Sequence, residues 1–241
     1  MQPLVSCLLV TRDRPQFFVQ ALRLYGAQTY RKRELVVVDD GDAPVADACR
    51  DLPGVTYVRL AQRTPTGTKL NLAAQAARGT ILQKIDDDDY YGPLFLDTAV
   101  DHLQRSRSSR ALVAWCCFAV LVVGSPHLYF SGHGWHAGGT LCFRRSLWAR
   151  CPFRDMYRSS DSWFIRDARP TLTRACAADQ YMVVRHGRNT WLRIKGADSV
   201  ESYFKRKRLS KTLRQVVGSS HTTFYKALMA RQWPGDEPRS S

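Results

Sequence analysis

The stretch Thr80-Ile81-Leu82-Gln83-Lys84-Ile85-Asp86-Asp87-Asp88-Asp89 decides how this chain folds. Its first six residues predict a buried strand, and Tyr90–Pro93 predicts a turn into the next helix. Four adjacent carboxylates repel one another, so a fold gathers them only where a cation or solvent compensates their charge. At the carboxyl end of a strand in an α/β sheet, such oxygen ligands suit Mg²⁺ or Mn²⁺ carrying a diphosphate. The alternative is an acidic loop held by surface lysines.

The first half of the chain alternates apolar runs with helical patterns. Strands are predicted at residues 5–10, 34–38, 55–60 and 80–85, and helices near 15–25, 45–50, 70–77 and 96–103, with Gly79 ending the third helix. Apolar strands that alternate with helices predict an α/β fold with a mostly parallel central sheet flanked by helices. The strands at 34–38 and 80–85 run into Asp39-Asp40 and the aspartate run. If these strands are near neighbours, both acidic groups face one crevice.

Composition sets broad limits on the kind of protein. A chain of 241 residues fits one α/β domain with a tail, and a 44% apolar content is typical of a folded protein. The net charge of +15 predicts attraction to polyanions, which include nucleic acid, anionic lipid and phosphorylated substrates. We expect residues 1–200 to form the main domain, divided into a nucleotide and metal half (1–106) and an acceptor half (107–200), followed by a helical extension (201–233) and a disordered tail (234–241).

Neither the N-terminus nor the cysteines indicate export. Met1–Val5 has no basic segment and no long apolar segment, so we expect no signal peptide. The apolar run at residues 111–123, about 13 residues, is too short for a membrane helix and predicts buried strand. Seven cysteines without paired metal spacing favour reduced thiols in the cytoplasm. Cys116 and Cys117 are expected to point to opposite faces of a strand as packing residues.

The densest positive segment is Lys205-Arg206-Lys207-Arg208. The apolar residues after it fall at helical spacing, which predicts an amphipathic basic helix containing Leu209, Leu213, Val216 and Val217. A solvated surface, an anionic membrane and nucleic acid are the three alternatives for its partner.

With these residues in place, the chain resembles a family 2 glycosyltransferase of the GT-A fold from about residue 4 to residue 195. Each motif is common alone, but their order and spacing are specific. The motifs are Thr11-Arg12-Asp13-Arg14-Pro15, Val37-Val38-Asp39-Asp40-Gly41, Gly67–Ala73 with Ala77-Arg78-Gly79, the aspartate run with Pro93, Gly138–Arg145, and Ser160-Asp161-Ser162-Trp163-Phe164.

The resemblance implies roles at the donor end of the site. It assigns Asp40 to the nucleobase, Thr11 and Arg12 to the base and ribose, and Asp88 to a Mn²⁺ or Mg²⁺ ion as a direct ligand. Asp86 and Asp87 are implied to contact the ribose or the metal's hydration shell. Lys69 is a candidate for a second positive charge on the diphosphate, with a solvated helix residue as its alternative.

The acceptor side needs a base that removes the proton from the attacking hydroxyl. Asp161 is the candidate, because Ser160 stands where the family often carries a second acidic residue. Asp155 and Asp167 are the other candidates, and a helix N-cap is the structural alternative for Asp161.

Histidines and aromatic residues surround the expected acceptor half. His133 and His136 have a spacing that suggests a metal, but because we expect no third or fourth ligand nearby, we predict an acceptor pocket instead. The acceptor-binding candidates are Trp135, His136, Gly138 and Gly139. His186 is either a metal ligand or a hydrogen-bonded structural residue, and Arg185 and Arg188 are candidates for the diphosphate.

The resemblance therefore implies an inverting, metal-dependent transferase that moves a sugar from a nucleotide-diphosphate donor, with UDP favoured, to a hydroxyl acceptor. The expected setting is polysaccharide or glycolipid synthesis in the cytoplasm, including the inner membrane face. A glycosyltransferase acting on a hydroxylated base in DNA and an inactive GT-A fold that binds nucleic acid are the rivals. A dinucleotide dehydrogenase and a P-loop NTPase are excluded by missing glycine motifs.

Overall fold

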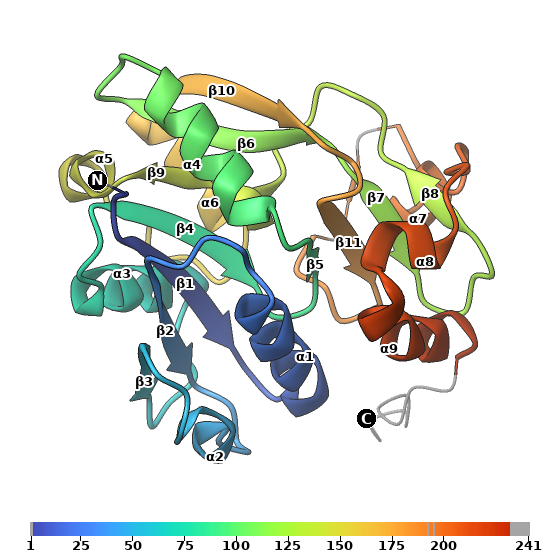
Figure 1. Ribbon diagram of the computed structural model, residues 1–241, viewed down its shortest axis with the longest axis horizontal. Helices are drawn as coiled ribbons and strands as arrows, with labels where there is room; N and C mark the ends of the chain where they lie inside the picture. Colours follow the sequence, from blue (N-terminus) through green and yellow to red (C-terminus); the bar gives the residue numbers. More distant parts are fainter. Residues whose placement is uncertain (1, 192, 195, 232–241) are drawn as a thin grey trace.

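The computed structural model describes residues 2–191, 193–194 and 196–231. One set of strands comprises β1 (Val5–Thr11), β2 (Arg33–Asp39), β3 (Val55–Arg59), β4 (Ile81–Asp86), β6 (Ala111–Cys117), β9 (Cys142–Arg144) and β10 (Thr171–Cys176). A second set comprises β5 (Tyr90–Tyr91), β7 (Ala119–Val122), β8 (Leu128–Phe130) and β11 (Tyr181–Arg185). Within the described ranges, the first set forms a seven-stranded sheet in the order β10-β6-β9-β4-β1-β2-β3, and the second a four-stranded sheet in the order β5-β11-β7-β8 (Figure 1).

Helices cover both faces of the larger sheet, as the alternating pattern predicts. The helices between residues 15 and 168 are α1 (Pro15–Gly26), α2 (Ala46–Cys49), α3 (Thr66–Ala76), α4 (Phe95–Arg105), the 3₁₀ turn η1 (Gly138–Thr140), α5 (Arg145–Arg150) and α6 (Ser160–Ala168). Those near the C-terminus are α7 (Val200–Phe204), α8 (Leu213–Val217) and α9 (Ser219–Met229). Strand pairs β1–β2, β1–β4, β2–β3 and β6–β10 are parallel, whereas β9 runs antiparallel to β4 and β6. The predicted α/β class with a mostly parallel sheet is confirmed.

Side chains of β1 divide between the two faces of the sheet because successive residues of a strand point in opposite directions. Val5, Cys7 and Leu9 pack in one apolar cluster with buried residues of α1 and α4. Leu8 packs in a second cluster with buried residues of α3, α5 and α6. The strands are therefore apolar throughout because each face of the sheet has its own helical cover.

The two acidic segments meet at one edge of the sheet. β2 and β4 lie on either side of β1, and all three strands run parallel. Thr11 at the end of β1 pairs with Asp39, and Val10 pairs with Asp86. The expectation that both acidic groups face one crevice follows from this order, since parallel strands end at the same edge.

The run at residues 111–123 is not one strand. It breaks at Phe118, where the chain leaves the larger sheet as β6 and enters the smaller sheet as β7. Gly79 does not end a helix either: α3 finishes at Ala76, and a Cβ at Gly79 would lie 2.6 Å from the carbonyl oxygen of Leu4. Close approach of the β1 backbone, rather than a helix cap, requires glycine at this position.

The prediction of one amphipathic basic helix from Lys205 to Val217 is wrong. Lys205–Arg208 follows the end of α7, is exposed, and forms a turn in which Arg208 bridges to Tyr129. Of the apolar residues after it, Leu209 lies in a loop and the other three lie in α8, where Val216 and Val217 are buried against the smaller sheet. Helical spacing alone missed the start of α8 at the capping box of Thr212, which begins a separate helix.

Two further expectations concern the ends and the membrane. The proposed tail at 234–241 lies outside the described residues, as does the end of the extension at 201–233. Among the described helices, none is long and apolar enough to cross a membrane.

Glu34 provides a test of how the fold depends on pH. This buried carboxylate accepts hydrogen bonds from Ser6 Oγ at 2.6 Å and from the backbone N–H of Arg78 at 2.5 Å. Burial raises its pKa, but the hydrogen bonds from Ser6 and Arg78 outweigh burial and lower it. Because the pKa is lower in the folded state, this stabilisation is present above the ordinary glutamate pKa, about 4.3, and is lost as the pH falls further.

We therefore expect Glu34→Gln to lower the free energy of unfolding by about 1–3 kcal/mol at neutral pH. The difference from wild type should shrink as the pH falls below about 4. Urea denaturation across this pH range measures it, with the exposed Asp51→Asn as control. A difference that stays constant with pH would contradict this account of Glu34.

Candidate active site

Arg14 and Thr11 hold the centre of the acidic run. The chain turns at Asp13, whose φ of 51° is left-handed, and Arg14 then reaches back over the end of β4. The Arg14 guanidinium lies 2.8 Å from Asp87 Oδ1 and donates to Asp88 Oδ2 at 2.5 Å. Thr11 Oγ1 donates to Asp87 Oδ2 at 2.6 Å. One guanidinium thus compensates two buried carboxylates, a role that the sequence pattern did not assign to Arg14.

Asp88, the expected metal ligand, pairs with several side chains. Besides Arg14, its Oδ2 lies 2.9 Å from His186 Nε2 and 3.3 Å from Asn189 Nδ2. Burial raises its pKa, but Arg14 and His186 outweigh burial and hold the pKa well below its usual range. The backbone N–H of Arg188 lies 3.4 Å from His186 Nδ1, which leaves Nε2 as the donor to Asp88. This geometry agrees with the hydrogen-bonded alternative for His186.

Asp87 and Asp89 lie deeper. Burial raises the pKa of Asp87 to about 6 against the lowering effect of Arg14. Asp89 accepts hydrogen bonds from Tyr181 Oη at 2.5 Å and from the backbone N–H of Val184 at 3.0 Å. Burial and the neighbouring Asp88 raise the pKa of Asp89 well above its ordinary value. Asp89 therefore joins β4 to β11 of the smaller sheet.

Asp86 faces the open side of the run. Its side chain is 32% exposed, and its Oδ1 accepts from Lys84 Nζ at 2.5 Å. Burial lowers the pKa of Lys84, but Asp86 and Asp161 outweigh burial and raise it. Lys84 therefore lies within electrostatic reach of both the acidic run and the expected base.

The predicted nucleotide contacts form a second group at the end of β2. Asp40 Oδ1 accepts from Lys69 Nζ at 2.6 Å, and its Oδ2 accepts from the backbone N–H of Thr64 at 2.7 Å. Arg12 donates to the carbonyl oxygen of Asp40 at 2.7 Å. Lys69 is buried against Asp40, so the solvated alternative for Lys69 is wrong.

Two adjacent glycines separate the acidic run from Asp161. A Cβ at Gly138 would lie 1.4 Å from Asp161 Oδ2, and a Cβ at Gly139 would lie 2.8 Å from Asp86 Oδ2. Since consecutive Cα atoms are about 3.8 Å apart, the two carboxylates approach opposite ends of one dipeptide. Gly139 also accepts from Tyr91 Oη at 2.9 Å, and the same hydroxyl lies 2.7 Å from the Asp86 backbone nitrogen, which ties η1 to the end of β4.

Asp161 lies in the first turn of α6, and Ser159 occupies the N-cap position, so the N-cap alternative for Asp161 is wrong. Its Oδ1 accepts from the neighbouring Ser162 N–H at 2.8 Å. Both other candidates are engaged elsewhere. Asp155 accepts from Thr68 Oγ1, and Asp167 forms an ion pair with Arg154 at 2.6 Å.

The aromatic acceptor candidates lie beside η1. Trp135 donates from Nε1 to the Ser131 carbonyl at 2.8 Å and packs against Trp191 and Phe204. His136 Nε2 is buried and has no hydrogen-bond partner within the part of the chain that the structure describes. Burial, followed by Arg174, lowers the pKa of His136, which favours the neutral imidazole.

Arg185 does not reach toward the run. Its guanidinium pairs with Glu201 at 2.7 Å and donates to the carbonyl oxygen of Trp191 at 2.8 Å. Arg185 therefore connects α7 to the loop that contains His186 and Asn189.

The donor set of the run fits a hard divalent cation. Asp86 to Asp89 bring four carboxylates together, and Arg14 and Lys84 are among the cations that pair with them. Carboxylate oxygens of Asp86 and Asp88 offer the ligand type that Mg²⁺ and Mn²⁺ prefer.

This architecture is that of solved glycosyltransferases with the GT-A fold. Over 79% of this chain, it matches the mannosyltransferase PcManGT from Pyrobaculum calidifontis in complex with GDP-Man and Mn²⁺, with a TM-score of 0.60 and 18% identity. Over 78% of this chain, it matches S. aureus TarS in complex with UDP-GlcNAc, with a TM-score of 0.60 and 16% identity. The chain spans 59% and 60% of those two proteins.

The sequence places the chain more specifically. The profile of glycosyl transferase family 2 matches residues 6–162, and the chain belongs to this family. It is 28% identical over 109 residues to the putative colanic acid biosynthesis glycosyl transferase WcaA of Escherichia coli (strain K12). That match covers 43% of this chain and 39% of the relative.

Gly138 allows a test of the position of Asp161 that removes no functional group. In Gly138→Ala, the new methyl group must displace the Asp161 side chain, whose atoms are the three nearest to the added Cβ. We expect donor turnover to fall roughly 100-fold, which is typical of a misplacement of about 1 Å, and Tm to stay near wild type. Gly26→Ala is the matched control, since nothing lies within 4 Å of its added Cβ. Unchanged turnover in Gly138→Ala would place the chemistry away from Asp161.

Proposed function

We propose that the chain is an inverting, metal-dependent glycosyltransferase that moves a sugar from a nucleotide-diphosphate donor to a hydroxyl acceptor. The observation that carries this proposal is the meeting of Asp161 and the acidic run across Gly138-Gly139. A donor-binding end and a general base must lie about one sugar ring apart for a direct displacement. The dipeptide has no side chains, which allows both carboxylates to approach it.

The donor end is assigned to the ends of β1, β2 and β4. Asp88 and Asp86 would hold Mn²⁺ or Mg²⁺, whose positive charge stabilises the leaving diphosphate. Asp40, positioned by Lys69 and Thr64, is the candidate for the nucleobase. Thr11 and Asp87 support the ribose side, and Arg14 keeps Asp87 and Asp88 in place.

The transfer step is assigned to Asp161. Its carboxylate removes the proton from the acceptor hydroxyl while that oxygen attacks the anomeric carbon from the face opposite the diphosphate. A new carbon–oxygen bond forms to the acceptor, and the bond from the anomeric carbon to the diphosphate oxygen breaks. The diphosphate leaves with the electron pair, and the proton stays on Asp161. Because the attack comes from the opposite face, the configuration at the anomeric carbon inverts.

The acceptor side is assigned to the loop before η1. Trp135 offers an indole face for stacking on a sugar, and the unpartnered His136 Nε2 suits a hydroxyl group. Polysaccharide or glycolipid synthesis at the cytoplasmic membrane face fits these features and the name of the E. coli relative. UDP is the favoured nucleotide, as in the TarS complex, although the PcManGT complex holds GDP-Man.

Calorimetric titration with UDP, GDP and dTDP tests the donor site. In the presence of Mn²⁺ we expect one diphosphate to bind, and EDTA should abolish its binding. Asp88→Ala should weaken the metal-dependent binding by at least about tenfold, because it removes a charged ligand. Absence of binding by all three diphosphates would contradict the proposed donor site.

Asp161→Asn tests the base, with hydrolysis of the matching nucleotide sugar as a readout that needs no acceptor. We expect hydrolysis to fall by about 10²–10⁴-fold while the affinity for the diphosphate is retained. Asp155→Asn and Asp167→Asn are the controls, since both carboxylates are engaged elsewhere. Near-wild-type hydrolysis in Asp161→Asn would reject the assigned base.

The exposed run Lys205–Arg208 is the proposed contact with an anionic membrane surface. Cosedimentation with vesicles containing anionic lipid should decrease when Lys205 and Arg206 are both changed to Glu, and it should decrease at high salt. Equal binding by wild type and variant would reject the membrane contact. Salt-sensitive binding of duplex DNA that the variant loses would favour the nucleic-acid alternative instead.

A further inference from the structure

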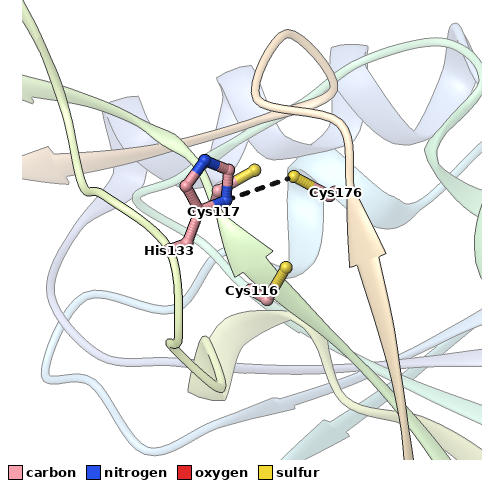
Figure 2. A group of neighbouring side chains, drawn as sticks. All are labelled: Cys116, Cys117, His133 and Cys176. Atoms are coloured by element: carbon pink, nitrogen blue, oxygen red, sulfur yellow. Dashed lines mark hydrogen bonds between the residues drawn. The ribbon is translucent and has the colours of Figure 1, made fainter.

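Three cysteines and one histidine converge at a place that the transfer reaction does not use. One ligand atom from each of Cys116, Cys117, His133 and Cys176 lies within 4.8 Å of all the others (Figure 2). The four residues come from the end of β6, the loop after β8 and the end of β10. Cys116 and Cys117 are buried, whereas His133 and Cys176 are exposed. The expectation that His133 has no further ligands nearby is therefore wrong.

An irregularity in β6 explains how two neighbouring cysteines turn to one point. Ala175 of β10 pairs with Trp115, but the next residue, Cys176, pairs with Cys117. Cys116 is thus an extra residue on β6, so that two residues of this strand stand opposite one residue of β10. In a regular strand, Cys116 and Cys117 would point to opposite faces, as the sequence pattern predicted. The bulge removes that alternation where the chain is about to leave the larger sheet.

The loop that carries His133 is fixed on both sides. The Ser131 N–H donates to the Phe118 carbonyl at 3.0 Å, and the Trp135 N–H donates to the Cys116 carbonyl at 3.2 Å. Gly132 and Gly134 have φ values of 80° and 93°, which allow the sharp turns on either side of His133.

The His133 ring is also held in place. It packs edge-on against Phe130, with 5.3 Å between the ring centroids. His133 Nδ1 lies 3.6 Å from Cys176 Sγ. The imidazole is therefore aimed at the thiols before any ion binds.

We propose that Cys116, Cys117, His133 and Cys176 form a tetrahedral Zn²⁺ site. Three thiolates and one imidazole are a ligand set that structural zinc sites use. Usual Zn–S and Zn–N bond lengths require about 3.6 Å between S and N ligand atoms and about 3.8 Å between S atoms. Cys176 Sγ and His133 Nδ1 already have this separation. The other distances between ligand atoms are at most 4.8 Å, and rotation of the cysteine side chains can shorten them to the required values. Three thiol protons pass to the buffer as the zinc–sulfur bonds form, and the imidazole binds in its neutral form.

The role of this zinc is structural. It ties the end of β6 to the end of β10, where both segments leave the larger sheet toward β7 and β11 of the smaller one. It also anchors His133, two residues before Trp135 and five before η1. Four protein ligands complete the coordination shell, so no position is left for a substrate. The proposal stands on these four residues alone and does not depend on the proposed function.

Metal analysis of the full-length protein, purified under reducing conditions without added chelator, is the first test. We expect about one Zn²⁺ per chain. Replacement by Co²⁺ should produce thiolate-to-metal charge-transfer bands and the strong visible bands of tetrahedral cobalt. Removal of zinc by a strong chelator should lower Tm, because the ion binds only the folded arrangement.

The two exposed ligands, His133 and Cys176, are the residues to substitute, because their replacement leaves the buried core intact. Cys176→Ser and His133→Asn should each weaken zinc binding by more than about 100-fold, because each loses a direct ligand, and the circular dichroism spectrum should stay unchanged. Cys151→Ser and His127→Asn are matched controls and should keep full zinc content. Asp88→Ala should also keep it, which separates this site from the ion at the acidic run.

Three results would overturn the proposal. One is zinc content or cobalt spectra that are the same in wild type, Cys176→Ser and His133→Asn. Another is reduced wild-type protein that takes up no Zn²⁺ or Co²⁺. The third is a disulfide between Cys176 and Cys116 or Cys117 in protein purified under reducing conditions, detected by peptide mapping without reductant.

Discussion

Mutual repulsion among Asp86, Asp87, Asp88 and Asp89 is the constraint on which the rest of the site depends. The fold meets it differently at each residue: Lys84 pairs with the first, Arg14 with the middle two, and Tyr181 with the last. Each partner comes from a different part of the chain. The strand order of the larger sheet, the turn after β1 and the contact with the smaller sheet are therefore all required to hold four carboxylates together.

Glycine at positions 138 and 139 allows two carboxylates, those of Asp161 and Asp86, to approach the same short backbone segment. A carboxylate approaches each of these residues so closely that a side chain there would collide with it. The backbone of η1 is anchored by Tyr91, which also contacts the Asp86 backbone. The carboxylates of Asp161 and Asp86 therefore lie against neighbouring residues of one short backbone segment.

Two features could be predicted from the sequence: the alternation of strands and helices in the first half, and the ending of the strands before Asp40 and before the acidic run at one edge of the sheet. Both follow from apolar periodicity and strand ends, which are local signals. Contacts that depend on irregular backbone were missed. Arg14 reaches its carboxylates only through the left-handed turn at Asp13, and the cysteine cluster exists only because a bulge interrupts β6. Helical spacing after residue 205 was misleading, since the apolar residues pack on the smaller sheet from separate short elements.

Burial of the acidic run shapes the electric field outside the molecule. Asp87, Asp88 and Asp89 are each less than 10% exposed, whereas the chain as a whole carries a net charge of +15. At distances beyond the surface, the excess of arginine and lysine dominates, and an approaching anion is attracted rather than repelled. The molecule thus combines an acidic interior with a basic exterior that attracts anions. Encounter with a phosphorylated ligand is accelerated by this field, and added salt, which screens the outer charges more than the buried ones, slows encounter more than it weakens the bound state.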